Sequence, residues 1–148
     1  MIRTLPILPR RIFLDTSAFF ALASPRDEHS SVAHALLRRL VDERCELVTT
    51  NFVLAELHAL LLKRVNRFVA LQTLLAFDRS DTTTVTRVRA GDEHRAKDIL
   101  TQYDDKNFSF ADTTSFAVME RLGIAHVFSL DDDFRQYGWI VLRLDDIR

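Results

Sequence analysis

Four acidic residues that lie far apart in the chain have the types and positions needed for metal chemistry. Asp15 and Asp131 each follow a short apolar run rich in strand-forming residues. Glu56 lies within an apolar stripe at helical spacing, and Asp112 begins another helical pattern. Carboxylates gathered in one pocket repel one another unless some take up protons or a divalent cation lies among them. Oxygen ligands of this kind favour Mg²⁺ or Mn²⁺, and such ions can activate water for attack on a phosphodiester.

The elements that would position these acids alternate between short strands and amphipathic helices. The predicted strands are residues 11–14, 46–49, 81–88, 124–130 and 139–142. The predicted helices are residues 18–23, 25–44, 52–64, 65–79, 92–103, a segment from 112 to about 122, and a short one around residue 134. This alternation predicts an α/β fold with a parallel sheet covered on both faces. The ligand crevice of such a sheet lies beyond the carboxyl ends of its strands, where Asp15 and Asp131 would stand.

Capping residues and apolar spacing predict where individual helices begin and which faces they bury. Ser24 and Pro25 indicate a helix start, with Ser24 as the cap. Thr50 or Asn51 would cap the helix that carries Glu56, and Gly91 would end the third strand. The apolar sets of two helices are Val32, Ala35, Leu36, Leu40 and Val41 in one, and Phe68, Leu71, Leu74 and Leu75 in the other.

Each acid also has a purely structural interpretation. Asp15 could cap the helix that follows it, and Asp112 could be an N-terminal acid favoured by the helix dipole. Glu56 could lie at the edge of its stripe and reach water. Asp131 is nearest the strand end, whereas Asp132 and Asp133 would serve the first turn of the short helix that follows.

The composition is that of one compact domain. The chain has 148 residues, of which 47% are hydrophobic and 28% charged, and its formal net charge is −1. No global basic field indicates nucleic acid, so a polyanionic partner would need a local basic patch or a bound cation. The single cysteine, Cys45, excludes an internal disulfide and fits a cytoplasmic protein. We expect a flexible arm over residues 1–10, a single domain over 11–148 and no membrane span, since no run approaches about 18 apolar residues.

Taken together, the segments around the acids resemble the PIN domain, and most closely the VapC-type toxin ribonucleases of bacterial toxin–antitoxin pairs. The resemblance covers nearly the whole chain and rests on four segments in order: the apolar strand with Asp15-Thr16-Ser17, then residues 49–57, 108–112 and 129–134. It implies a three-layer α/β/α sandwich and an endoribonuclease that depends on Mg²⁺ or Mn²⁺. It also implies a cognate antitoxin, a homodimer and a structured RNA substrate, either transfer RNA or ribosomal RNA.

The resemblance also assigns roles to residues. Asp15 and Asp112 would be the principal metal ligands, Glu56 would complete the acidic site and Asp131 would be the fourth acid. Ser129-Leu130 stands where the family commonly has threonine and an aromatic residue, which leaves open whether Asp131 or Asp133 is the fourth acid. The hydroxyls expected to support the site are those of Thr16, Ser17 and Ser129, together with Ser115 beside Asp112.

Binding of RNA would need cations outside the acidic pocket. The candidates for phosphate contacts are Arg64, Arg67 and Lys106, with Arg38, Arg39 and Lys63 as further possibilities. For any one of them, a solvated helix face is the alternative interpretation.

Two other functions fit parts of the pattern. An aspartyl-phosphate phosphatase or phosphotransferase also has an Asp after its first strand, but it needs a second acid two residues later, where this chain has Ser17. A catalytically silent module with the same fold would use the acidic crevice only to bind a basic partner.

Overall fold

The computed structural model describes residues 8–143. Most of the expected N-terminal arm, and Asp145 and Asp146 of the expected solvated tail, lie outside this range. Within it, Leu8 packs against the core and the Arg10 carbonyl accepts a hydrogen bond from the Glu46 amide at 2.8 Å. The division into an arm and a single domain stays a prediction.

Twelve elements follow one another in the described part of the chain. The strands are β1 (Arg11–Leu14), β2 (Glu46–Thr50), β3 (Thr83–Thr86), β4 (His126–Phe128) and β5 (Ile140–Val141). The helices are α1 (Thr16–Ala23), α2 (Ser30–Asp42), α3 (Asn51–Arg64), α4 (Arg67–Arg79), α5 (Ala90–Gln102), α6 (Phe110–Leu122) and α7 (Asp133–Tyr137).

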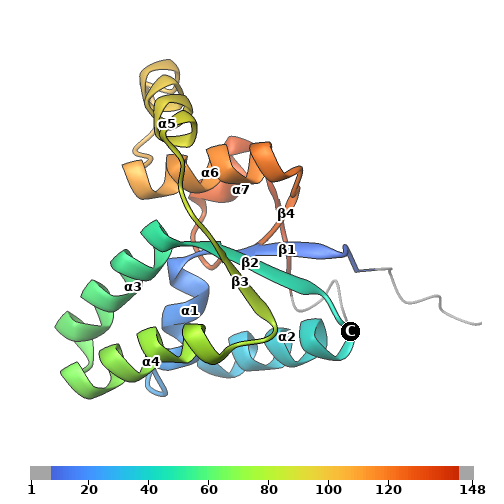
Figure 1. Ribbon diagram of the computed structural model, residues 1–148, viewed down its shortest axis with the longest axis vertical. Coiled ribbons are helices and arrows are strands. Elements are labelled where there is room, and N and C mark those ends of the chain that lie inside the picture. The colour runs from blue at the N-terminus through green and yellow to red at the C-terminus, as the bar shows by residue number, and fades with distance from the viewer. Residues whose placement is uncertain (1–7, 144–148) are drawn as a thin grey trace, which may run out of the picture.

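The strands form one sheet in the order β3-β2-β1-β4-β5, and each described pairing is parallel. Phe13 of β1 aligns with Val48 of β2 on one side and with Val127 of β4 on the other. Helices α1 to α4 lie on one side of the sheet and α5, α6 and α7 on the other, where α5 packs on α6 (Figure 1). The predicted three-layer α/β/α fold is therefore confirmed.

The centre of the sheet is deeply buried because helices cover both of its faces. Ile12, Phe13 and Leu14 of β1 are each 0% exposed, which explains why this strand is a continuous apolar run rather than an alternating one. Phe13 and Phe116 both contact the ring of Phe134 from α7. The short α7 is thereby fixed to the core, and the acidic loop that precedes it is held in place.

The predicted start of the second helix is wrong. Ser24 ends α1, its backbone N–H donating to the Phe20 carbonyl, and α2 begins only at Ser30. The predicted buried face of this helix is also displaced. The residues that α2 buries are Ala33, Leu36 and Leu40, whereas Val32 and Val41 are exposed. Both sets have helical spacing, so periodicity could not distinguish them without knowing where α1 packs.

Two further expectations are wrong in detail. Gly91 lies in the first turn of α5 rather than at the end of β3. Three of the four residues in the predicted stripe of α4 are exposed, namely Phe68 at 72%, Leu71 and Leu75, because α4 packs inward through Ala70, whereas Leu74 is half-buried. The prediction of a cap on α3 is confirmed for Thr50, whose side chain accepts from the Val53 amide.

None of the helices in residues 8–143 has the length and apolar character needed to cross a membrane.

Candidate active site

The carboxyl ends of the two central strands bring Asp15 and the Ser129–Asp131 loop together. Asp15 follows β1, and its amide donates to the Phe128 carbonyl of β4 at 3.4 Å. Because parallel neighbours end at the same edge of the sheet, Asp15 and Ser129, which are 114 positions apart in sequence, become neighbours in space. The site is therefore built at the edge that the strand order predicts.

Asp15 is 6% exposed and is held on every side by hydrogen-bond donors. Its Oδ1 accepts from the Ser17 hydroxyl at 2.8 Å and the Ala18 amide at 3.2 Å, and its Oδ2 accepts from the Ser129 hydroxyl at 2.8 Å. The bond from the Ala18 amide makes Asp15 the N-cap of α1, which confirms the prediction that Asp15 could cap this helix.

Burial nevertheless raises the pKa of Asp15 to about 7. The hydrogen bonds from Ser129, Ser17 and the Ala18 amide lower the pKa, but they do not offset the loss of water, and the negative charge of Asp131 raises it further. A buried carboxylate that is short of positive charge is favoured by a cation placed beside it.

Three more carboxylates gather next to this position. One oxygen from each of Asp112, Asp131 and Asp133 lies within 4.8 Å of the others. Asp112 comes from the first turn of α6, Asp131 from the loop after β4 and Asp133 from the first residue of α7. The Ser129 hydroxyl connects this cluster to Asp15, because it donates to Asp15 and accepts from the Asp131 amide at 3.0 Å.

Mutual repulsion is evident within the cluster. Burial raises the pKa of Asp133 to about 7, and hydrogen bonding and the negative charges of Asp112 and Asp131 raise it further. The sequence predicts a role for Asp133 in the first turn of the short helix and leaves open whether it or Asp131 is the fourth acid. It does occupy that turn, and its amide donates to Asp131 Oδ1, but its carboxylate also joins the cluster.

Asp112 serves the helix and the cluster at once. It is the third residue of a capping box, in which its Oδ2 accepts from the Ser109 amide at 3.1 Å and the Ser109 hydroxyl accepts from the Asp112 amide at 3.0 Å. The capping box fixes the rotamer of Asp112, so the carboxylate is positioned before any ligand arrives.

Glu56 is exposed on α3 and is not one of the three clustered carboxylates. It nevertheless lies on the helix that approaches the cluster. The ring of Phe52, one turn before Glu56, packs edge-on against Phe110 at 5.9 Å, two residues before Asp112. The structure thus places Glu56 near the start of α6 and in water, which is the first of its two interpretations.

The predicted hydroxyls divide into two pairs. Ser17 and Ser129 both bond to Asp15, and Ser17 also accepts from the Leu130 amide at 2.8 Å. Thr16 is buried at the first residue of α1, and Ser115 is 1% exposed one turn after Asp112.

The candidate RNA-binding cations lie at different distances from the acids. Lys106 precedes α6, and its charge contributes to the low pKa of Asp132, which is due first to hydrogen bonds from Gln136 and Arg135. Arg64 and Arg67 stand instead at the turn between α3 and α4. Since α3 has 14 residues, this turn lies roughly 20 Å from the start of the helix. Arg64 lies over the ring of Phe20 at 6.0 Å.

The donor set fits a divalent cation with hard oxygen ligands. Asp112, Asp131 and Asp133 offer carboxylate oxygens within one coordination sphere of each other, and Asp15 lies one hydroxyl away. The only other ligand types that would favour a softer metal are histidine and cysteine, and the cluster contains neither. Mg²⁺ and Mn²⁺ therefore fit better than Zn²⁺.

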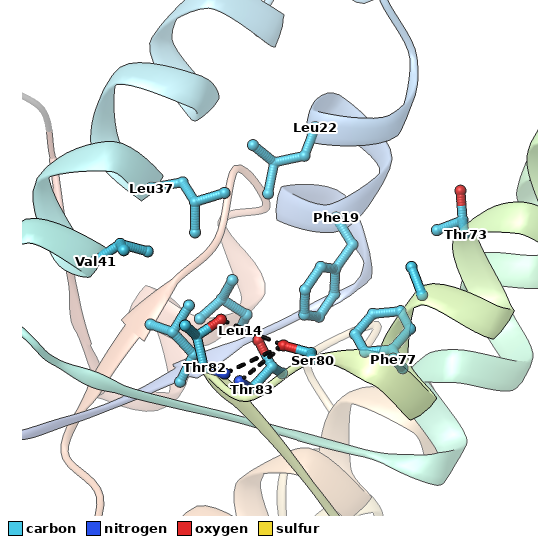
Figure 2. A pocket seen from close by; sticks show the side chains of 12 residues that line it. Leu14, Phe19, Leu22, Leu37, Val41, Thr73, Phe77, Ser80, Thr82 and Thr83 are labelled. Atoms are coloured by element: carbon cyan, nitrogen blue, oxygen red, sulfur yellow. Dashed lines mark hydrogen bonds between the residues drawn. The ribbon is translucent and has the colours of Figure 1, made fainter.

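An apolar cavity elsewhere lacks this chemistry. A hollow of about 260 Å³ lies between α1, α2, α4 and the sheet, and its wall contains Phe19, Leu37 and Phe77 (Figure 2). The polar atoms shown there belong to hydroxyl residues such as Ser80, which accepts from the Thr83 amide at 3.1 Å. Its lining includes no charged side chain, so it can bind apolar groups but offers no acid or base.

The sequence left open whether Asp131 or Asp133 joins the site, and the structure brings both carboxylates to Asp112. Asp131-Asp132-Asp133 follows one strand, and the chain must turn before it is clear which carboxylates point inward. The structure divides them: Asp132 accepts from Arg135 and Gln136 at 2.8 Å each, while Asp131 and Asp133 face Asp112. The sequence signal for this arrangement is that Asp131 and Asp133 are two residues apart, so a tight turn can bring both carboxylates to one side.

Several known proteins are similar to this chain over most of its length. A family model described as the PIN domain matches residues 12–140. The 23S rRNA-specific endonuclease VapC20 of Mycobacterium tuberculosis, from strains CDC 1551 and H37Rv, is 35% identical over 133 residues, which are 89% of this chain and 98% of the relative.

Two solved structures are similar in fold. The crystal structure of Mycobacterium tuberculosis VapC20, described as a sarcin–ricin loop cleaving toxin, matches with a TM-score of 0.80 and 33% identity over 89% of this chain and 98% of that one. VapBC2 from Rickettsia felis, bound to a DNA fragment from its promoter, matches with a TM-score of 0.67 and 15% identity over 89% and 97%. At that identity the second match concerns the fold alone.

Proposed function

The chain belongs to the PIN domain family and is a VapC-type ribonuclease, and from this premise we propose that it cuts structured RNA at the acidic edge of its sheet. The observation that carries the proposal is the group of Asp112, Asp131 and Asp133, with Asp15 one hydroxyl away. Enzymes of this family depend on a divalent metal, and we propose Mg²⁺, with Mn²⁺ as its substitute.

The residues of the chain would prepare the site in three ways. Asp15, Asp112 and Asp131 would hold the cation, with Asp133 as a further ligand. Ser17 and Ser129 orient Asp15 by hydrogen bonds, and the Ser109 capping box orients Asp112. When bound, the ion would supply activation of water and neutralisation of charge on a phosphodiester. Glu56, in water on α3, would complete the acidic wall on the substrate side.

The proposed substrate is a loop of ribosomal RNA. The relative that is 35% identical over 89% of this chain is a 23S rRNA-specific endonuclease, and its crystal structure is described as that of a sarcin–ricin loop cleaving toxin. A transfer RNA is the alternative substrate, and mapping the 5′ ends of the products would distinguish the two.

A cleavage assay with the purified chain tests the proposal. Wild type with Mg²⁺ should cut a ribosomal RNA preparation, and Asp112→Asn should lose this activity. Asp104→Asn is a matched control, because Asp104 is exposed in the loop before α6 and lies outside the cluster. In a melting experiment Mn²⁺ should stabilise wild type and Asp104→Asn far more than Asp112→Asn. Cleavage by Asp112→Asn at the wild-type rate would contradict the proposal.

Phosphate contacts would come from cations around the acidic edge. Lys106 is the candidate nearest the acids, and Arg64 and Arg67 would contact RNA further along its backbone. Each phosphate contact contributes close to one unit to the slope of log affinity against log salt concentration. Replacing Arg64 and Arg67 together by Gln should lower that slope by about two, and an unchanged slope would remove both from the interface.

We propose an antitoxin as the protein partner, acting in the cytoplasm with the RNA substrate. The support is the exposed apolar face of α4, where Phe68, Leu71 and Leu75 stand in water at helical spacing. Phe68→Glu should weaken binding of the antitoxin encoded beside this chain, while RNA cleavage by the free chain stays unchanged. The expected homodimer stays a prediction, and analytical ultracentrifugation of the chain alone tests it.

A further inference from the structure

A second hollow begins where the acidic cluster ends. It measures about 360 Å³, within the range of about 300–1,000 Å³ usual for small-ligand sites, and it lies between α2, the loop after β4, α7 and β5. Asp131 belongs both to the cluster and to the wall of this hollow. Anything bound to the acids through a phosphate would therefore have its neighbouring groups at the mouth of this pocket.

The interior of the hollow is apolar. Leu36, Phe128 and Leu142 form its buried part, and Val32 and Leu130 stand at its rim. Val32 and Leu130 are two of the large apolar side chains that remain exposed, at 39% and 38%. Packing within residues 8–143 does not cover them, whereas a ligand seated in the hollow would.

Polar groups at the rim are placed to limit what can enter. Arg135 lines the hollow, and its Nε donates to Asp132 Oδ1 at 2.8 Å, which fixes the planar guanidinium at the edge. A fixed guanidinium offers a flat surface for stacking, and the charge of Asp132 reduces its attraction for a free anion. The wall holds two acids, Asp131 and Asp132, and two cations, Arg135 and Arg143, so its charges balance and a flat, uncharged ring suits it better than a phosphate does.

The hollow is also coupled to the acids through the backbone. Ser17, which bonds to Asp15, accepts from the Leu130 amide at 2.8 Å. The hydroxyl that orients the carboxylate thus also fixes the residue at the rim. A group seated against Leu130 would be held in register with the acids.

We propose that this hollow is a subsite for one unpaired nucleobase next to the phosphodiester that is cut. This inference rests on the proposed function and adds to it the recognition of a flanking nucleotide. Loops of RNA are read by splayed-out bases that stack on side chains, and enzymes that extract a base seat it between apolar or aromatic groups. The pocket would therefore select single-stranded loops over duplex RNA.

Abasic substrates test the proposal. The RNA hairpin that wild type cuts is prepared with one abasic nucleotide at either position flanking the cleavage site, and kcat/KM is measured with Mg²⁺. One of the two substitutions should lower kcat/KM of wild type about tenfold or more, the effect of losing one base–side-chain stack.

Two matched variants locate the effect. Val32→Trp should fill the hollow, lower kcat/KM for intact RNA about tenfold, and remove the further loss caused by the abasic site. Val41→Trp is the control, because Val41 lies on the same helix with similar exposure, 41%, but faces the cavity of Figure 2. It should discriminate against the abasic substrate as wild type does.

The possible results are distinguishable. If wild type cuts intact RNA but both abasic substrates react equally fast, the base subsite is wrong while the nuclease proposal stands. If Val32→Trp loses antitoxin binding but cuts RNA normally, the hollow binds protein and the subsite is again wrong. Failure of wild type to cut any RNA would overturn both proposals.

Discussion

The two ends of α6 carry acidic residues in opposite circumstances. At its start, Asp112 faces Asp131 and Asp133, and burial with like charge raises the pKa of Asp133 to about 7. At its other end, Glu120 pairs with Arg95 and Arg121 pairs with Asp92 at 2.9 Å. The same helix therefore holds acids that are neutralised by the chain and acids that are not.

The two acids that pair with arginines, Asp92 and Glu120, have pKa values below their ordinary values. Burial alone would raise the pKa of Asp92, but hydrogen bonds from Arg121 and the Arg89 amide outweigh it and leave the pKa below its ordinary value. The pKa of Glu120 is lowered in the same manner by Arg95 and Tyr137. Acids that the protein supplies with cations stabilise the fold, and acids left without one are available to an external cation.

The largest expected effect follows from removing a carboxylate at the start of α6, where the acids face one another; we call this the uncompensated end. Asp112→Asn should lower RNA cleavage on the order of 10³-fold or more, since a group in the reacting constellation is lost. The stability of the metal-free protein should change little or rise, because repulsion within the cluster is relieved. Single-turnover cleavage and urea unfolding measure the two effects. Loss of stability in step with loss of activity would indicate a structural role instead.

The next effect concerns pH. In the metal-free protein the pKa of Asp15 is about 7, against an ordinary value of 3.8, so the folded state keeps a proton that the unfolded state has lost. Stability should therefore be highest below about pH 4 for this group and fall as pH rises to 7, by up to roughly 4 kcal/mol. Asp15→Asn should make this dependence less steep and leave the part due to Asp133, whose pKa burial likewise raises to about 7; urea unfolding at several pH values measures the difference.

A bound divalent metal should counteract the fall of stability with rising pH. At the proposed site, Mn²⁺ would compete with protons for the carboxylates, so its affinity should increase as pH rises through 7. An apparent affinity for Mn²⁺ that is independent of pH between 5 and 8 would show that Asp15 and Asp133 do not bind the metal. The same titration with Asp92→Asn should follow wild type, because Asp92 lies at the other end of α6, where arginines pair with the acids; we call this the compensated end.

A loss of stability without loss of chemistry is expected at the compensated end. Asp92 is 4% exposed and accepts two hydrogen bonds from Arg121 at 2.9 Å. Asp92→Asn should leave the guanidinium without its counter-charge and cost roughly 3 kcal/mol of unfolding free energy. Specific activity of the folded fraction should stay at the wild-type value. A fall in kcat at temperatures well below the melting transition would show that the two ends of α6 are coupled.

The sequence predicted the acidic end of α6 better than the compensated end, for a physical reason. Asp15, Asp112 and Asp131 follow strand ends or helix starts, so the parallel-sheet rule alone brings them to one edge. The Asp92–Arg121 pair depends on how α5 packs against α6, and no local pattern specifies that contact. The choice between Asp131 and Asp133 stayed open for the same reason, since the turn after β4 decides which acids point inward.

Helix faces show a similar limit. The stripe Phe68, Leu71 and Leu75 has the spacing of a buried face, yet it is exposed, because Ala70 faces the core. Periodicity identifies two possible faces when apolar residues cover most of a helix, and only tertiary packing chooses between them. The order and type of the elements did follow from the sequence, because strand runs and capping residues such as Thr50 are local signals.

The smallest expected effect tests how far compensation depends on burial. Arg95 and Glu120 pair at 3.0 Å, but their side chains are 43% and 33% exposed, so water and salt screen the attraction. Glu120→Gln should cost only about 0.5–1 kcal/mol, and the cost should shrink in high salt. The Tyr137 hydroxyl, which donates to Glu120 at 2.6 Å, would keep an oxygen acceptor in the glutamine, and this also limits the cost. Urea unfolding of Glu120→Gln and Asp92→Asn at low and high salt makes the comparison. Equal losses for the two variants would mean that burial does not set the strength of these pairs, and that the contrast between the ends of α6 has another cause.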